Sequence, residues 1–172
     1  MDIQFALSIL LFVLPAYVAN ALPVLLGGGT PMDLGKSLGG KRILGDGKTI
    51  RGFFAGVLGG TVAGGILTLL IRVPFFPSAQ FQFLAFALMS FGTMAGDALG
   101  SFLKRRLGMQ DGKPFILDQL MFLAVALLLA YPLSSPEPYA PIPLVALFAA
   151  TYVLHLGSNF VANRLGWKKV PW

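Results

Sequence analysis

Residues 96 to 118 hold the side chains of this sequence that are best suited to chemistry. Asp97, Asp111 and Asp118 are three of its seven acidic residues, and four of its thirteen basic residues fall in the same stretch. The sequence on either side is almost uncharged. Charges of both signs between apolar runs are costly unless ions, substrate or solvent compensate them, so we expect the chemistry here.

The spacing of these residues favours a metal–phosphate site. On a helix, Asp97, Ser101 and Lys104 project from one face, and Arg105 lies beside them. Asp118 follows a break that contains Gly and Pro, so a hairpin can bring it against Asp97. Two carboxylates beside cations are typical of Mg²⁺ bound to a phosphate, with the cations neutralising the remaining phosphate charge.

Each acidic residue also has a purely structural interpretation. Asp97 could pair with Lys104 or Arg105 and only tie two helices together. An acid several turns inside an apolar segment favours a functional role instead. Asp111 is a third candidate metal ligand, but a turn residue before Gly112 explains it equally well.

A second candidate site lies at residues 45 to 52, which read GDGKTIRG. Lys48, Thr49 and Arg51 stand among glycines just before an expected helix, an arrangement that can cradle phosphates. The spacing differs from that of a Walker A motif. The alternative is an ordinary glycine-rich connector whose cations only orient the chain in a membrane.

The last apolar segment carries a polar residue at every fourth position: Thr151, His155, Asn159 and Asn163. We interpret the deeper ones, His155 included, as interhelical hydrogen-bond partners. Asn159 and Asn163 are expected closer to the cytosol and could reach a base or a ribose. Asn20, near the end of the first apolar segment, could join the same interior.

These residues require a membrane bundle to position them. The chain is 56% hydrophobic and only 12% charged, and this charge content is about half that of a soluble domain. A helix needs about 20 apolar residues to cross a bilayer. The sequence therefore predicts an all-α polytopic membrane protein, a single domain over residues 1 to 172. Its bundle of five transmembrane helices would lie at residues 3–26, 52–71, 79–103, 116–133 and 142–163.

Basic residues predict the orientation of this bundle. In the five-helix arrangement 12 of the 13 Lys and Arg residues fall on one side, and Arg72 alone on the other. Cytoplasmic loops are the ones enriched in Lys and Arg. We therefore expect an outside N-terminus, a cytoplasmic C-terminus, and a cell-membrane protein whose active site faces the cytoplasm. Orientation and phosphate binding explain the net charge of +6, so we expect no nucleic acid partner.

Glycines recur every four residues at 52–64 and at 92–100. Such stripes let helix backbones approach closely in lipid. The alternative is that Gly96 or Gly100 makes room for a nucleotide. The chain contains no cysteine, which excludes disulfides and thiolate sites.

The pattern at 96–118 resembles the signature of the membrane CTP:phosphatidate cytidylyltransferases, in which a Ser precedes a Lys-Arg pair and two Asp residues. The sequence departs from that signature because Gln110 and Gln119 replace its usual Lys and Arg, and because its Gly-His-Gly-Gly stretch is missing. ILGDGKTIRG in the first loop, AYVANALPVL at 16–25 and the C-terminal KKVPW resemble the archaeal branch of this family, the CDP-archaeol synthases.

This resemblance implies a Mg²⁺-dependent transfer of CMP from CTP to an archaeal ether-lipid phosphate, 2,3-di-O-geranylgeranylglyceryl phosphate. CDP-archaeol and pyrophosphate would be the products. We expect Asp97, Asp118 and Lys104 to be the catalytic residues, with Mg²⁺ on the carboxylates. Lys48 and Arg51 would close over the phosphates from the other side. The isoprenoid chains would lie between helices, in a groove open to membrane lipids.

Two other classes remain as alternatives. Another membrane phosphotransferase of lipid synthesis, using a CDP-lipid donor, would carry a closer DGxxAR…GxxxD array, which this sequence lacks. A small transporter would usually show internal symmetry between its halves, and the five apolar segments are unlike one another.

Overall fold

The computed structural model describes residues 2–109 and 116–166, without the side chains of Asp118, Gln119 and His155. Five helices dominate it: α1 (Ile3–Leu26), α2 (Ile50–Leu70), α3 (Ala79–Arg106), α4 (Ile116–Ala130) and α5 (Pro141–Arg164). The smaller elements are the antiparallel pair β1 (Ser37–Leu38) and β2 (Lys41–Arg42), and the 3₁₀ turns η1 (Tyr131–Leu133) and η2 (Glu137–Tyr139).

The mostly helical architecture confirms the prediction of a polytopic membrane protein. Within the described residues, α1, α2, α3 and α5 are long and apolar enough to cross a membrane. The fourth apolar helix is shorter, and it reaches residue 133 only with the turn η1. Whether all five helices span the bilayer therefore stays a prediction.

Polar side chains cap the N-termini of three of the long helices. The Asp2 carboxylate accepts a hydrogen bond from the Gln4 amide at 2.6 Å. The Thr49 hydroxyl accepts one from the Gly52 amide at 3.1 Å, and Ser78 begins α3 in the same way. Such caps satisfy amides that have no partner within their own helix. Thr49 therefore fixes the start of α2 immediately after Lys48.

The predicted glycine stripes are helix contacts. A Cβ atom on Gly60 of α2 would lie 2.8 Å from the Pro15 carbonyl oxygen in α1. One on Gly92 of α3 would lie 2.9 Å from the Cα of Ala126 in α4, and one on Gly96 would lie 2.8 Å from the Cα of Phe122. Backbones at this separation leave no room for a ligand, so Gly96 packs against α4 rather than making space for a nucleotide.

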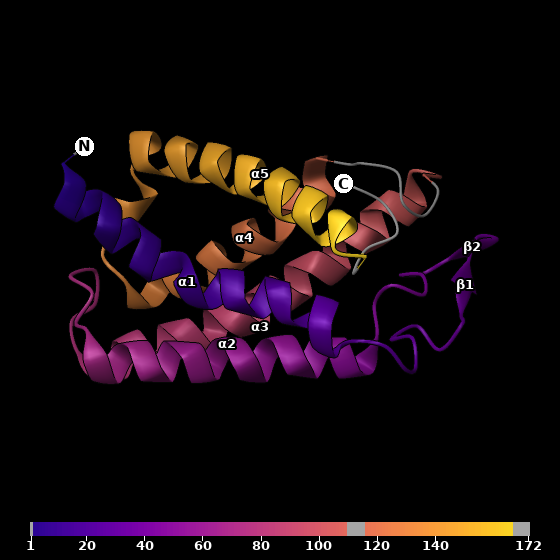
Figure 1. The fold of residues 1–172 in the computed structure, drawn as a ribbon, viewed down its shortest axis with the longest axis horizontal. Coiled ribbons are helices and arrows are strands. Elements are labelled where there is room, and N and C mark those ends of the chain that lie inside the picture. Colours follow the sequence, from indigo (N-terminus) through magenta and orange to yellow (C-terminus); the bar gives the residue numbers. More distant parts are fainter. Residues whose placement is uncertain (1, 110–115, 167–172) are drawn as a thin grey trace.

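The helices run alternately up and down, so their ends gather at two opposite faces (Figure 1). The N-terminus, the α2–α3 connection and the η1–η2 segment lie at one end. The β1–β2 pair and the C-terminal ends of α3 and α5 lie at the other. The long basic loop between α1 and α2 is at this second end, together with the basic last turn of α3.

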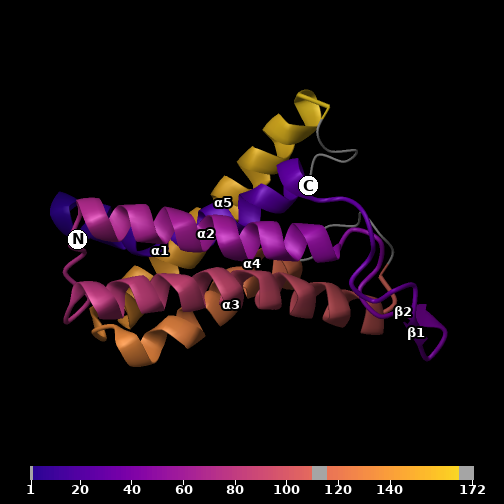
Figure 2. The ribbon, with the colours of Figure 1, turned by 90° about the horizontal axis from the view of Figure 1, so that it is seen from below.

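Helix α5 leaves the bundle at an angle. Figure 2 shows α1 to α4 packed together while the C-terminal half of α5 points away from them. Helix α5 packs mainly on α4 and η2. Residues of α1 and α5 line a groove that is described below.

Candidate active site

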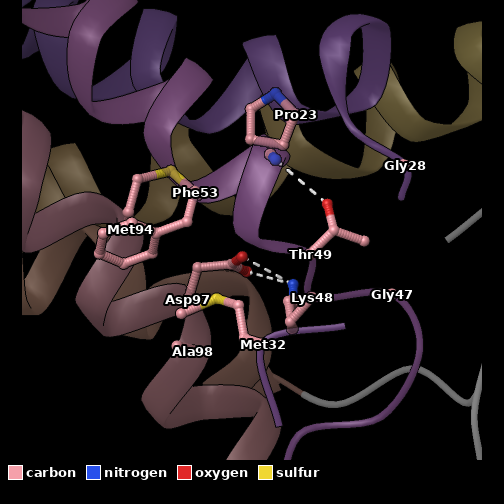
Figure 3. A pocket seen from close by; sticks show the side chains of 11 residues that line it. Pro23, Gly28, Met32, Gly47, Lys48, Thr49, Phe53, Met94, Asp97 and Ala98 are labelled. Carbon is pink, nitrogen blue, oxygen red and sulfur yellow. Dashed lines mark hydrogen bonds and ion pairs between the residues drawn. The ribbon is translucent and has the colours of Figure 1, made fainter. Parts of the chain in front are cut away.

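An ion pair joins the two candidate sites that the sequence analysis treated separately. The Lys48 ammonium lies 2.7 Å from both carboxylate oxygens of Asp97 (Figure 3). Only 26% of the Lys48 side chain and 18% of the Asp97 side chain are exposed. Asp97 was expected to pair with Lys104 or Arg105 if its role were structural, and the structure gives it Lys48 of the first loop.

Backbone hydrogen bonds hold Lys48 in place. The Met32 amide donates to the Lys48 carbonyl at 2.8 Å, and the Ile50 amide donates to the Thr30 carbonyl at 3.0 Å. Pro31 and Thr49 form an antiparallel bridge between these bonds. Residues 30–32 and 48–50 therefore pair as two short antiparallel segments, and the second segment leads directly into the capped start of α2.

Two cavities meet at Asp97. The first, which we call the loop cavity, has a volume of about 50 Å³. The second, which we call the α1–α5 groove, has a volume of about 500 Å³. The loop cavity is lined by Pro23, Gly28, Met32, Gly47, Lys48, Thr49, Gly52, Phe53, Met94, Asp97 and Ala98. Asp97 also lines the α1–α5 groove, so this carboxylate is common to both spaces.

The α1–α5 groove is apolar along most of its length. Val24, Leu25 and Leu154 are among its lining residues, and Asn20 and Asn159 add polar groups. Asn20 is half-buried, and Asn159 is buried at 8% exposure. An apolar groove with a few polar groups near a carboxylate suits an amphiphilic ligand.

A hydrogen-bonded pair connects α1 to α5 beside this groove. The hydroxyls of Tyr17 and Thr151 lie 2.7 Å apart, and Thr151 also donates to the Leu147 carbonyl at 2.6 Å. Thr151 is therefore an interhelical partner, as predicted for the deeper residues of its stripe. The same prediction for His155 concerns a side chain outside the described residues.

The remaining candidate residues lie around this centre. Ser101 and Lys104 are buried on α3, one and two turns beyond Asp97. Arg51 is exposed in the first turn of α2 and lines neither cavity. Asp111 and the side chain of Asp118 lie outside the described residues.

The last turn of α3 holds the first loop. Arg105 reaches the Leu44 carbonyl with its Nε at 3.5 Å and the Met109 carbonyl with Nη1 at 3.2 Å. Arg106 donates to the carbonyls of Lys41 and Arg42 at 3.1 and 2.8 Å. Arg105, expected from the sequence to be a cation for phosphate, therefore also docks the loop, a contact that its spacing did not predict.

Comparison with known proteins identifies the family. The family model described as CarS-like: CDP-archaeol synthase matches residues 2–172. The chain belongs to the CDP-archaeol synthase family. The CDP-archaeol synthase of Pyrococcus horikoshii is 47% identical over 163 residues, which cover 94% of each chain. That of Archaeoglobus fulgidus is 48% identical over 169 residues, covering 92% of this chain and 93% of the relative.

A solved structure of an intramembrane enzyme for archaeal membrane lipid biosynthesis has the same fold, with a TM-score of 0.78 at 39% identity. The match covers 92% of this chain and 94% of the chain in the solved structure. The resemblance stated from residues 96–118 and the loop motifs is therefore confirmed. Membership of the CDP-archaeol synthase family makes the chain a nucleotidyltransferase enzyme of the membrane.

The chemistry of Asp97 fits the Mg²⁺ ion expected for a CDP-archaeol synthase. Mg²⁺ usually binds through one or two carboxylates, with substrate phosphates and water completing its coordination. Asp97 supplies one carboxylate in the wall of both cavities. The Lys48 ammonium contacts both of its oxygens in this structure, so Mg²⁺ would take the place of this ammonium on Asp97. Among the described side chains no group of three or more His, Cys, Asp or Glu residues surrounds a common point, so further ligands would come from substrate or from outside the described residues.

Proposed function

We propose that this protein transfers CMP from CTP to the phosphate of an unsaturated archaeal ether lipid, 2,3-di-O-geranylgeranylglyceryl phosphate. The products are CDP-archaeol and pyrophosphate. The observation that carries the proposal is the position of Asp97 between the loop cavity and the α1–α5 groove. A two-substrate reaction between a water-soluble nucleotide and a lipid needs one charged centre that both can reach.

The loop cavity suits a phosphate group. Its volume of about 50 Å³ is far below the several hundred Å³ of typical ligand pockets, so only part of a nucleotide fits there. Gly47, Lys48 and Thr49 line this space. We place the phosphoryl group that reacts beside them, with Arg51 as a further candidate contact from the first turn of α2.

The α1–α5 groove suits the lipid. Its apolar walls match isoprenoid chains, and the divergence of α5 seen in Figure 2 lies on the same side of the bundle. Asn20 and Asn159 are the proposed contacts for the polar part of a substrate, the base or ribose of CTP in particular. Both lie in the groove that Asp97 reaches.

Alignment and charge neutralisation would supply most of the catalysis. The lipid phosphate is an anion at neutral pH, so its oxygen can attack the α-phosphorus of CTP without a dedicated base. We assign Lys48 to the charge on the reacting phosphate, and Ser101, Lys104 and Arg105 to the leaving pyrophosphate. When bound to Asp97, with Asp118 and Asp111 as further candidate ligands, Mg²⁺ would neutralise charge on the triphosphate oxygens.

Five membrane spans with an outside N-terminus and a cytoplasmic C-terminus complete the proposal. The support is that the first loop, the last turn of α3 and the end of α5 lie at the same end of the bundle (Figure 1). That end carries Lys48, Lys104 and Arg105, and cytoplasmic loops are rich in such residues. The active site then faces the cytoplasm, where CTP is available.

The test is a pyrophosphate-release assay. Purified protein in detergent is mixed with Mg²⁺, the ether-lipid phosphate and one nucleotide at a time. We expect turnover with CTP to exceed turnover with ATP or GTP, because buried polar groups stay unpaired with a wrong base. Equal turnover with all nucleotides, or no pyrophosphate from CTP, would contradict the proposed reaction.

A further inference from the structure

A buried aspartate organises the loop that carries Lys48. The Asp33 side chain is 1% exposed and accepts five hydrogen bonds. The Arg42 guanidinium donates two, at 2.7 and 3.2 Å. The amides of Leu44 and Gly45 donate at 3.0 Å, and the Gly35 amide donates at 3.1 Å. These bonds close residues 33 to 45 into one ring around a single carboxylate.

Glycine geometry makes this ring possible. Gly35 and Gly45 have φ angles of 78° and 90°, a region that residues with a side chain rarely adopt. A Cβ atom on Gly45 would also lie 3.0 Å from the guanidinium of Arg105. The ring is thus shaped to present its amides to Asp33 and to lie against the end of α3.

The ring connects directly to Lys48. Asp33 follows Met32, whose amide donates to the Lys48 carbonyl at 2.8 Å. On the other side, Gly45 is three residues before Lys48, and the Lys48 amide donates back to the Gly45 carbonyl at 3.4 Å. Both ends of the ring therefore contact the backbone of the residue whose ammonium reaches Asp97.

One guanidinium links two carboxylates at the ring. Arg42 pairs with Asp33 at 2.7 Å and with the exposed Asp46 at 2.7 Å. The Arg42 guanidinium and the three amides hold the pKa of Asp33 well below its usual range. Asp33 lines neither the loop cavity nor the α1–α5 groove, so a direct contact with substrate does not explain it. Arg42 lines a separate space of about 200 Å³ beside Arg105.

We infer that Asp33 is a positioning residue of the active site, which holds the first loop so that the Lys48 ammonium reaches Asp97 and the reacting phosphate. This inference rests on the proposed role of Lys48 in catalysis. It assigns Asp33 no contact with substrate. The expected route of its effect on the reaction is through Lys48, and combining the two substitutions tests this route.

The first measurement is independent of activity. Lys36, Lys41 and Arg42 are tryptic sites within the ring, and a ring held by Asp33 resists cleavage. We expect Asp33→Asn to be cleaved there at least several times faster than wild type in the same detergent. Asp46→Asn is the matched control, because it removes a carboxylate from Arg42 that is 77% exposed; its cleavage rate should equal that of wild type.

The second measurement is a double-mutant cycle on the catalytic efficiency with CTP. We expect Asp33→Asn to lower kcat/KM by about tenfold or more, and to cause little further loss when Lys48 is already alanine, since coupled residues are not additive. A general folding defect would instead multiply with the loss from Lys48→Ala. Asp46→Asn should leave kcat/KM unchanged.

The outcomes separate the inference from the proposed function. Faster tryptic cleavage together with a non-additive loss of efficiency supports the role of Asp33. Wild-type cleavage of Asp33→Asn, or a loss that multiplies with that of Lys48→Ala, overturns it. If Asp33→Asn does not fold, Arg42→Gln serves both measurements, because it removes two of the five bonds and leaves the amides. Arg42→Gln also removes one tryptic site, so its cleavage is compared with wild type at Lys36 and Lys41 only. A wild-type protein without CTP turnover would refute the proposed function, and the cleavage assay would still test the ring.

Discussion

Replacing Lys48 by alanine is the perturbation that best separates a catalytic loop from a topological signal. If the cations of the first loop only orient the chain, Lys36, Lys41 and Arg42 still do so after Lys48 is lost. If Lys48 neutralises phosphate charge beside Asp97, its removal lowers the rate. The structure favours the second interpretation because the ammonium lies 2.7 Å from both Asp97 oxygens.

The size of the effect follows from the burial of this pair. Its side chains are only 26% and 18% exposed, so little solvent screens the charges. Losing one such charge-assisted hydrogen bond costs about 1.5–3 kcal/mol, which corresponds to roughly 10- to 150-fold in rate. We therefore predict that Lys48→Ala lowers kcat/KM for CTP by at least about tenfold while membrane insertion stays unchanged.

Pyrophosphate release at several CTP concentrations measures this loss, with Lys36→Ala as the control. Lys36 lies in the same loop, is exposed, and has no side-chain partner among the described residues, so its removal changes net charge without touching the site. Wild-type efficiency in Lys48→Ala would refute the reasoning. An equal loss in Lys36→Ala would assign the effect to loop charge in general.

Three further predictions address packing, topology and pH. Gly60→Ala should destabilise the protein by about 1–3 kcal/mol in a thermal melt, because the added Cβ would press on α1. The control Gly157→Ala should leave the melting temperature unchanged, because a Cβ there meets nothing within 4 Å. Equal melting temperatures of the two variants would contradict the packing account. Cysteines introduced at Gly28 and at Pro136 of this Cys-free chain should label from opposite sides of the membrane, and labelling from one side would refute the five-span arrangement. The folded-state pKa of Asp33 lies below its unfolded value of about 3.9, so its contribution to stability is present above that pH and is lost as pH falls further. The difference in melting temperature between wild type and Asp33→Asn should thus be constant from about pH 8 to 5 and shrink below about pH 4, and a constant difference at all pH values would contradict this assignment.

The helices could be predicted because each depends on composition and short-range pattern. Apolar length located α1, α2, α3 and α5 to within a few residues, and the four-residue glycine spacing correctly predicted close helix contacts. The direction of α5 could not be predicted. Its angle to the bundle depends on tertiary contacts such as that of Thr151, in the middle of α5, with Tyr17 of α1, and no local pattern encodes such a contact.

The site was predicted in two halves. Asp97 was identified as an acid inside an apolar segment, and Lys48 as a cation before a helix. Their ion pair spans 49 positions and depends on the folded loop, so spacing alone pointed to Lys104 or Arg105 as the partner. Asp33 was missed because its role rests on amides presented by glycines with positive φ. The available signal was that Asp33 and Asp46 are the two acids among residues 27 to 51, which carry five basic residues.

Turnover of Asp97→Asn tests the central claim most directly, since this one carboxylate borders both the loop cavity and the α1–α5 groove. An amide has nearly the same shape but is a poor Mg²⁺ ligand. Pyrophosphate release from CTP with the ether-lipid phosphate should be abolished at saturating Mg²⁺, while the variant melts as a folded protein and Asp46→Asn keeps the wild-type rate. A rate near that of wild type in Asp97→Asn would show that the carboxylate is structural and would contradict the proposed site.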